Sequence, residues 1–154
     1  MTKKIFQSII IVAATVLLAS LTIILGVFYE YFGNIQKGQL TDELNLASVS
    51  VIKDGVDYLE HLQSDHYRLT WIDTDGTVLY DTETGNEELE NHKDRAEVKT
   101  AFEKGIGEST RYSATLMEKT RYYAKRLEDG TVLRISAKYA TTGLLVLGML
   151  QPII

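Results

Sequence analysis

The N-terminal part of the chain contains a long stretch without charge. No charged residue occurs from Ile5 to Tyr29, where the sequence reads IFQSIIIVAATVLLASLTIILGVFY. As an α-helix this stretch would rise about 37 Å, which exceeds the roughly 30 Å hydrocarbon layer of a bilayer. A cleaved signal peptide is the alternative, but such peptides have an apolar core of about 7 to 15 residues and an Ala-x-Ala-like cleavage site. The length therefore favours an uncleaved transmembrane helix at residues 5–29.

The charges on either side of this stretch predict its direction. Lys3 and Lys4 precede it and Glu30 follows it. Because positive charge accumulates on the cytoplasmic side of membrane helices, we expect a cytoplasmic N-terminus at residues 1–4. Residues 30–138 are then extracytoplasmic, and the chain resides in the cell membrane with the lipid bilayer as a partner.

The other end of the chain, TTGLLVLGMLQPII, carries no charge after Lys138. Counted from Ala140, it gives only about 22 Å of helix, which is too short to cross a bilayer. It is either a tail on the membrane surface or the start of a second transmembrane helix at residues 140–154. We favour the second, because a chain that stops on Ile153 and Ile154 has no polar residue to meet the far headgroups. On that interpretation the sequence is the N-terminal fragment of a larger protein.

The segment between the two apolar ends is acidic. It holds all 21 acidic residues and 14 of the 16 basic ones, a net charge of −7. Cysteine is absent from the 154 residues, which excludes disulfides, thiolate metal sites and a cysteine nucleophile. No basic run is interleaved with aromatic residues, so nucleic acid is not an expected partner. One folded domain of about 100 residues fits this segment.

A helical repeat of apolar residues opens the acidic segment. Steps of three and four residues predict a stalk helix over about residues 36–62 that continues from the membrane helix. The apolar stripe packs either on the sheet of its own domain or on the same stripe of a second chain, and amphipathic helices most often cover their own core. The stripe consists of Leu40, Leu44, Ala47, Val51, Gly55, Leu59 and Leu62.

Five strand-like runs follow, over about residues 67–137. The first two, residues 67–72 and 77–80, flank Asp73-Thr74-Asp75-Gly76 and predict a hairpin. These turn residues also resemble part of a calcium loop, but an EF-hand has its Gly at the sixth position, whereas Gly76 is the fourth, so a plain turn is favoured and no metal is expected. The other runs are residues 109–116, 120–127 and 131–137.

A short helix is predicted between the second and third strands. Residues 81–91 are polar and acidic and predict a loop. Asp94-Arg95-Ala96-Glu97 then has the form of a capping box, in which Asp94 accepts free N–H groups and Glu97 reaches back. Gly105 ends the helix. The order of elements predicts an α+β domain, with an antiparallel five-stranded sheet, a long N-terminal helix, and helices on one face.

Three segments of the sequence resemble a known family. RLTWIDTDGTVLYDT, ENHKDRAEV and GESTRYSATLMEKTRYYAKRLEDGTVLRIS are similar to the extracytoplasmic sensor region of bacterial sensor histidine kinases of the phosphate-regulon type. The more discriminating motifs are Asn91-His92-x-x-Arg95, Arg111-Tyr112-Ser113 and Tyr122-Tyr123-Ala124. The resemblance extends over the whole chain, including LLVLGMLQP near its end. It implies a PAS-like or Cache fold held between two transmembrane helices, in a homodimer.

In that family the second membrane helix leads into a HAMP linker, a helical hairpin with the phosphorylated histidine, and an ATP-binding domain. None of His61, His66 and His92 stands in a His-Glu-Leu-Arg-Thr-Pro setting, and no Asn- or Gly-rich nucleotide-binding box occurs. The resemblance therefore implies that ATP, Mg²⁺ and the response regulator belong to a cytoplasmic kinase core outside these residues. We expect neither catalytic residues nor cofactors in the fragment itself.

The expected function is the signal-sensing input module of a two-component sensor kinase. In that role a stimulus shifts the stalk relative to the final strand, and the membrane helices pass the displacement inward. Two alternatives remain, because fold does not fix output. One is the ectodomain of a chemoreceptor or cyclic-dinucleotide enzyme, and the other is a membrane-tethered binding domain without catalytic output.

Polar side chains on the last strands and beside the short helix form the candidate ligand site. Strand alternation separates Arg111 from Tyr112 and places Arg121 with Tyr123. In one interpretation the arginines bind a small anion through bidentate hydrogen bonds while tyrosines orient it; an envelope protein is the other expected partner. In the other, tyrosines fill the core, the cations face water, and loop residues only fix the loop onto the sheet. The candidate residues are Arg111, Tyr112, Arg121, Tyr123, His92 and Arg95.

Overall fold

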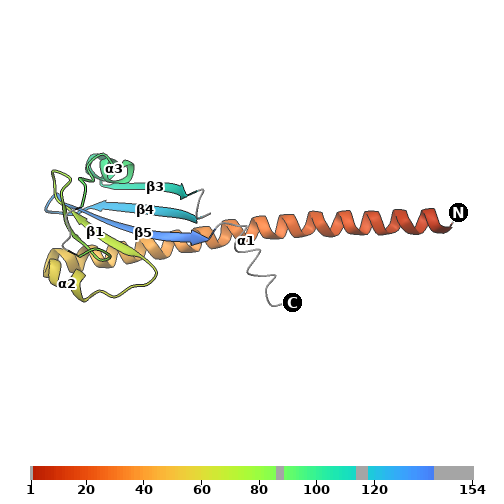
Figure 1. The fold of residues 1–154 in the computed structure, drawn as a ribbon, viewed down its shortest axis with the longest axis horizontal. Coiled ribbons are helices and arrows are strands. Elements are labelled where there is room, and N and C mark those ends of the chain that lie inside the picture. Colours follow the sequence, from red (N-terminus) through yellow and green to blue (C-terminus); the bar gives the residue numbers. More distant parts are fainter. Residues whose placement is uncertain (1, 86–88, 114–117, 141–154) are drawn as a thin grey trace. The chain divides into compact units, whose positions relative to one another are not determined.

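The computed structural model describes residues 2–85, 89–113 and 118–140 of the chain (Figure 1). It confirms the α+β class, with a long N-terminal helix and a five-stranded antiparallel sheet. The chain divides into two compact units, Met1–Gly38 and Gln39–Ile154. The elements in chain order are α1 (Thr2–Asp54), α2 (Val56–His61), β1 (Arg68–Ile72), β2 (Val78–Asp81), α3 (Ala96–Lys104), β3 (Ile106–Ser113), β4 (Glu118–Arg126) and β5 (Val132–Ala140).

The first unit consists of the apolar part of α1. Residues 5–29 are helical throughout, and large apolar side chains such as Ile9 and Leu17 are exposed. Within the described residues, α1 is the one helix long and apolar enough to cross a membrane, a test that N-terminal signal sequences also pass. The hydroxyls of Ser8, Thr15 and Thr22 each donate to the carbonyl oxygen four residues earlier. These three hydroxyls are therefore hydrogen-bonded within the helix itself.

In the second unit the strands form one antiparallel sheet in the order β2-β1-β5-β4-β3. The central strand is β5, where Ile135 pairs with Leu69 of β1 on one side and Tyr123 of β4 on the other. The predicted turn between β1 and β2 is confirmed at Gly76, whose φ of 94° lies in the left-handed region that favours glycine. The predicted second membrane segment lies outside the described residues, except that Ala140 is the last residue of β5.

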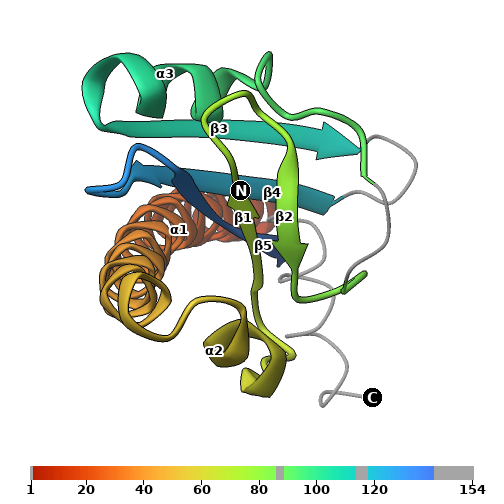
Figure 2. The ribbon, with the colours of Figure 1, turned by 90° about the vertical axis from the view of Figure 1, so that its left-hand side faces the viewer.

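One face of the sheet packs on the C-terminal part of α1 and on α2 (Figure 2). This packing confirms that the predicted stripe covers the sheet of its own domain. The stalk is not one helix to residue 62, because Gly55 has a φ of 62° and separates α1 from α2. The buried residues of this core are Leu40, Leu44, Ala47, Val51, Leu59, Leu69, Tyr123, Leu127, Leu133, Ile135 and Ala137.

The opposite face of the sheet carries α3 (Figure 2). A smaller apolar cluster joins Val98 and Ala101 of α3 to Ile72, Ala124 and Val132. Helices therefore lie on both faces, whereas the sequence predicted them on one.

Close packing of α3 on β3 depends on a glycine. A Cβ added to Gly107 would lie 1.9 Å from the carbonyl oxygen of Glu97. Any larger residue at this position would therefore push α3 away from the strand.

The N-terminus of α3 differs from the predicted capping box. The N-cap is Arg95 and no side-chain cap hydrogen bond is formed there. Glu97 is buried and its carboxylate is used elsewhere, so it does not reach back to the residue before the helix in the predicted manner. The predicted end of the helix is confirmed, because Gly105 is the C-cap with a φ of 88°.

The predicted strands are found with shifted ends. β3 begins at Ile106, three residues before the predicted start, and the predicted end of that strand at Leu116 falls outside the described residues. β4 begins at Glu118 and β5 continues to Ala140, beyond the predicted end at residue 137.

Candidate functional site

A carboxylate is buried between α3 and the sheet. Glu97, the second residue of α3, has 0% exposure. Nη2 of Arg111 on β3 donates to both carboxylate oxygens, at 2.8 and 2.9 Å, and the hydroxyl of Ser109 donates to Oε2. Nη1 of Arg134 on β5 lies 3.5 Å from Oε1. The carboxylate thus connects α3 to the edge strand β3 and to the central strand of the sheet.

The polar network continues across the same face toward β2. Nη2 of Arg134 donates to Oγ1 of Thr70 at 3.0 Å, and Thr70 donates to Oδ2 of Asp81 at 2.7 Å. Nε of Arg68 also donates to Asp81, at 2.8 Å, and its Nη1 donates to the exposed Glu83 at 2.6 Å. A chain of charged and polar groups therefore runs from α3 through β5 and β1 to β2.

An aromatic ring on β4 supports the two arginines of this network. The guanidinium carbon of Arg111 lies 4.2 Å from the centroid of the Tyr122 ring, and that of Arg134 lies 5.4 Å from it. Both distances fall within the range of cation–π attraction.

The buried carboxylates stay ionised because hydrogen bonds and cations outweigh burial. Burial raises the pKa of Glu97, but hydrogen bonds from Ser109 and from its own N–H, with the charges of Arg111 and Arg134, bring the pKa below its ordinary value. Burial likewise opposes ionisation of Asp81, and the hydrogen bonds of Arg68 and Thr70 lower its pKa overall. Burial is also the main reason that the pKa of Arg134 is lowered.

His92 is held beside this network by the β1–β2 turn. The backbone N–H of His92 donates to the carbonyl oxygen of Gly76 at 2.8 Å. The side-chain amide of Asn91 donates to the carbonyl oxygen of Asp75 at 3.1 Å. The His92 residue is 6% exposed. Burial, followed by the charges of Arg134 and Arg95, lowers the pKa of His92 to about 4. The imidazole is therefore neutral at ordinary pH.

The structure does not bring the six candidate residues together. Arg111 and His92 lie on the face that carries α3. Tyr123 belongs to the core on the α1 face, and strand alternation places Arg121 on that face too. Tyr112 is 57% exposed. The set therefore divides between the two faces of the sheet.

Arg95 lies at the N-cap of α3. Its Nη2 is 3.7 Å from the exposed Glu90. His92 lies in the loop that leads into the helix, three residues before Arg95.

Sequence reasoning missed most of the buried network. The capping-box pattern assigns Glu97 to the start of the helix, and no motif in the sequence marks the other members, which are Arg134, Thr70, Asp81 and Arg68. One signal was available: Arg134 stands in the run Val132-Leu133-Arg134-Ile135, where apolar neighbours indicate burial on both faces of a strand. A charge in such a position requires a buried partner.

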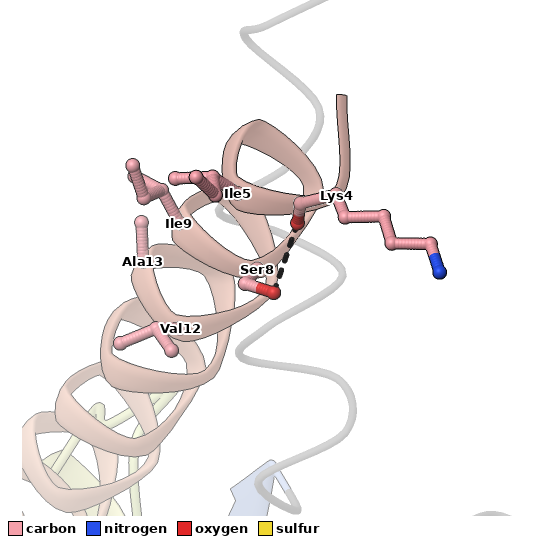
Figure 3. A pocket seen from close by; sticks show the side chains of 6 residues that line it. All are labelled: Lys4, Ile5, Ser8, Ile9, Val12 and Ala13. Carbon is pink, nitrogen blue, oxygen red and sulfur yellow. Dashed lines mark hydrogen bonds between the residues drawn. The ribbon is translucent and has the colours of Figure 1, made fainter. Parts of the chain in front are cut away.

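A shallow hollow on the apolar part of α1 is not a ligand site of the folded domain. It is lined by side chains from successive turns at the N-terminal end of α1, within the first unit (Figure 3). The only polar contact between the residues drawn there joins the hydroxyl of Ser8 to the carbonyl oxygen of Lys4, at 3.0 Å. The lining residues are Lys4, Ile5, Ser8, Ile9, Val12 and Ala13.

Comparison with known proteins gives little information on function. No protein-family model and no curated protein matches the chain. Among solved structures, the chain is similar to the Bacillus subtilis YkuI protein, which has an EAL domain and was crystallised in complex with its substrate c-di-GMP and calcium. The two are 13% identical, and the match covers 74% of this chain and 37% of that one. With a TM-score of 0.40, the similarity carries no argument about family or function.

Proposed function

We propose that the chain is the signal-sensing input module of a membrane-bound two-component sensor histidine kinase. Residues 5–29 are the first transmembrane helix, residues 30–138 are a PAS-like or Cache domain outside the cytoplasm, and a second transmembrane helix follows. ATP, Mg²⁺ and the response regulator act on a cytoplasmic kinase core. This proposal rests on the resemblance of the sequence segments to that family.

One structural observation supports the proposal above the others. A single helix, α1, contains both the apolar segment and the stripe of Leu40, Leu44, Ala47 and Val51 that packs on the sheet. A stimulus that alters the packing between this stripe and the sheet acts on the same helix that enters the membrane. Signalling then follows from a shift between two packing arrangements, and a ligand must bind them unequally to have an effect.

Topology is the first test of the proposal. Reporter enzymes that are active only outside the cytoplasm, fused within residues 81–85, should be active, and the same reporters fused before residue 5 should be inactive. The chain should also keep its N-terminal segment after export. An internal location of residues 81–85, or release of the domain by a signal peptidase, would contradict the proposal.

Kinase output is the second test, made on the full-length gene product in membrane vesicles with ATP and Mg²⁺. Leu44 is 3% exposed and faces the sheet, whereas Leu79 on β2 is 38% exposed. Leu44→Ala should change the rate at which the response regulator is phosphorylated by several-fold or more, and Leu79→Ala should leave it close to that of the unmodified protein. Absence of any phosphorylation by the unmodified protein would refute the kinase assignment.

A further inference from the structure

Four aromatic side chains lie close together on α1, where its charge-free stretch ends. All four are exposed, by 52% for Phe28, 39% for Tyr29, 59% for Tyr31 and 59% for Phe32. The rings of Phe28 and Phe32 are stacked with their centroids 6.0 Å apart, and those of Tyr31 and Phe32 meet edge to face at 5.9 Å. These four residues are called the aromatic patch below.

The aromatic patch lies on one side of the helix. Successive residues of an α-helix are about 100° apart around its axis, so Phe28 and Phe32 share a side, with the two tyrosines next to them. Glu30 is two positions from each phenylalanine and therefore points to the opposite side. The carboxylate of this turn is thus kept away from the rings, which leaves the aromatic side suited to contact with lipid.

The position of the patch along α1 matches the thickness of a bilayer. Lys4 precedes Phe28 and Phe32 by about 36 Å and about 42 Å of helix, respectively. A bilayer measures roughly 30 Å across its hydrocarbon layer and roughly 40–45 Å with its headgroups. When Lys3 and Lys4 lie among the headgroups of one leaflet, the patch therefore reaches the headgroup level of the other.

The chemistry of the patch fits that level of the membrane. The tyrosine rings have an apolar body and a polar hydroxyl, and such side chains are enriched where acyl chains meet headgroups and water. The two phenylalanines add apolar surface directly beside them. A protein partner is another possible occupant of exposed aromatic rings, but this patch continues without a gap from the uncharged stretch that ends at Tyr29.

We propose that the aromatic patch is embedded in the interfacial layer of the leaflet next to the folded domain, where phospholipid headgroups and glycerol groups contact it and fix the depth of α1. The assignment rests on the transmembrane helix of the proposed function. Depth matters for signalling, because the same helix continues to the stripe that packs on the sheet.

The depth of α1 is measured on the whole chain in phosphatidylcholine vesicles. Because the chain has no cysteine, single substitutions carry a spin label: Val16→Cys in the middle of the apolar stretch, and Ile24→Cys and Ile35→Cys on the aromatic side before and after the patch. The ratio of collisions with oxygen and with a water-soluble nickel complex gives the depth of each label. We expect the labels at positions 16 and 24 in the hydrocarbon layer and the label at position 35 on its water side.

Replacement of two rings tests the role of the patch. Phe28→Ala combined with Phe32→Ala shortens the apolar part of the helix at its domain end, so the midpoint of the remaining apolar part moves by about two residues toward Lys4. The labels at Ile24 and Ile35 should then both become shallower by about 3–4 Å, the rise of about two residues. Both variants lie in the first unit, outside the core of the folded domain, whose melting temperature should not change.

Leu17→Ala combined with Leu21→Ala is the matched control. These leucines are 65% and 49% exposed, have the same spacing of four residues, and lie within the apolar stretch, so the depths should not change. Unchanged depths in the phenylalanine variant, or an equal shift in the control, would overturn the proposal and leave the membrane helix in place. A label at Val16 that meets the nickel complex as often as the label at Ile35 would show that α1 does not cross the bilayer, which would overturn the proposed function as well.

Discussion

The carboxylate of Glu97 on α3 and the guanidinium of Arg134 on the central strand lie 3.5 Å apart, and both side chains are buried. The pair joins the helix to the middle of the sheet, while Arg111 joins the same carboxylate to its edge. Isolated charges are costly to bury, so each member of this group depends on the others. Removing one charge should therefore affect the whole α3 face.

Substitution of Glu97 by Gln should be strongly destabilising. The change keeps the shape of the side chain but leaves the buried Arg134 without its nearest carboxylate. Breaking a buried ion pair in this way costs about 3–5 kcal/mol. Urea unfolding of the chain in detergent measures the loss, with Glu103→Gln as the control, because Glu103 is an exposed residue of the same helix. Equal stability of the two variants would show that the buried pair is unimportant.

Stability should depend on pH through His92. In the folded chain the pKa of His92 is about 4, below its ordinary value of 6.5, so the unfolded chain binds this proton first as the pH is lowered. Its contribution to stability is complete above about pH 6.5 and decreases as the pH falls to about 4. The lowered pKa values of Asp81 and Glu97 act in the same direction, but mainly below pH 4.5.

The measurement for His92 is the melting temperature as a function of pH. The unmodified chain in chloride should lose stability between pH 6.5 and pH 4.5, and His92→Gln should show a flatter curve over this interval. A curve for His92→Gln that parallels that of the unmodified chain would assign the pH dependence to other groups.

The fold could be predicted from local patterns because most of its elements are determined locally. The stripe from Leu40 to Val51 follows helical spacing, and Gly76 and Gly105 mark a turn and a helix end through their left-handed backbone. The spacing of apolar residues does not predict the end of α1, because it continues through Gly55, whereas the helical backbone is interrupted at that residue. The face on which α3 lies depends on contacts between segments distant in sequence, such as Val98 with Ile72 and Val132.

The candidate site could be predicted only in part, for a related reason. Alternation along one strand assigns its residues to two faces, but it does not align one strand with the next. The register that pairs Ser109 with Tyr122 places Arg111 with the even-numbered side chains of β4 and separates it from Arg121 and Tyr123. Glu97 matches the capping-box pattern in sequence. Only the structure shows that its carboxylate instead pairs with the guanidinium groups of Arg111 and Arg134.

Gly107→Ala should separate α3 from the sheet. The new Cβ would lie 1.9 Å from the carbonyl oxygen of Glu97 and 2.8 Å from its carbonyl carbon, and backbone atoms cannot move aside as a flexible side chain can. Overpacking of this kind typically costs about 1–3 kcal/mol, and sometimes more. Gly38→Ala is the control, because Gly38 is in α1 with nothing within 4 Å of its added Cβ. That variant should be neutral or slightly more stable, and both are compared by thermal unfolding.

The outer side of α1 should mediate the proposed homodimer. Leu46 and Val49 are 66% and 68% exposed, on the side of the helix away from the stripe that covers the sheet. Apolar side chains at a spacing of three residues on an exposed helix favour pairing with another helix. Because the chain has no cysteine, a single Val49→Cys reports such pairing without interference.

Under mild oxidation in membranes, Val49→Cys should form disulfide-linked dimers, because a parallel pair of helices brings identical positions within the Cα separation of about 4.4–6.8 Å that a disulfide requires. Lys99→Cys, at an exposed position of α3, should form few. Equal cross-linking of both variants would indicate random collision in the bilayer. Selective cross-linking at Lys99 would place the dimer contact on the α3 face, next to the polar network, and would exclude α1 as the interface.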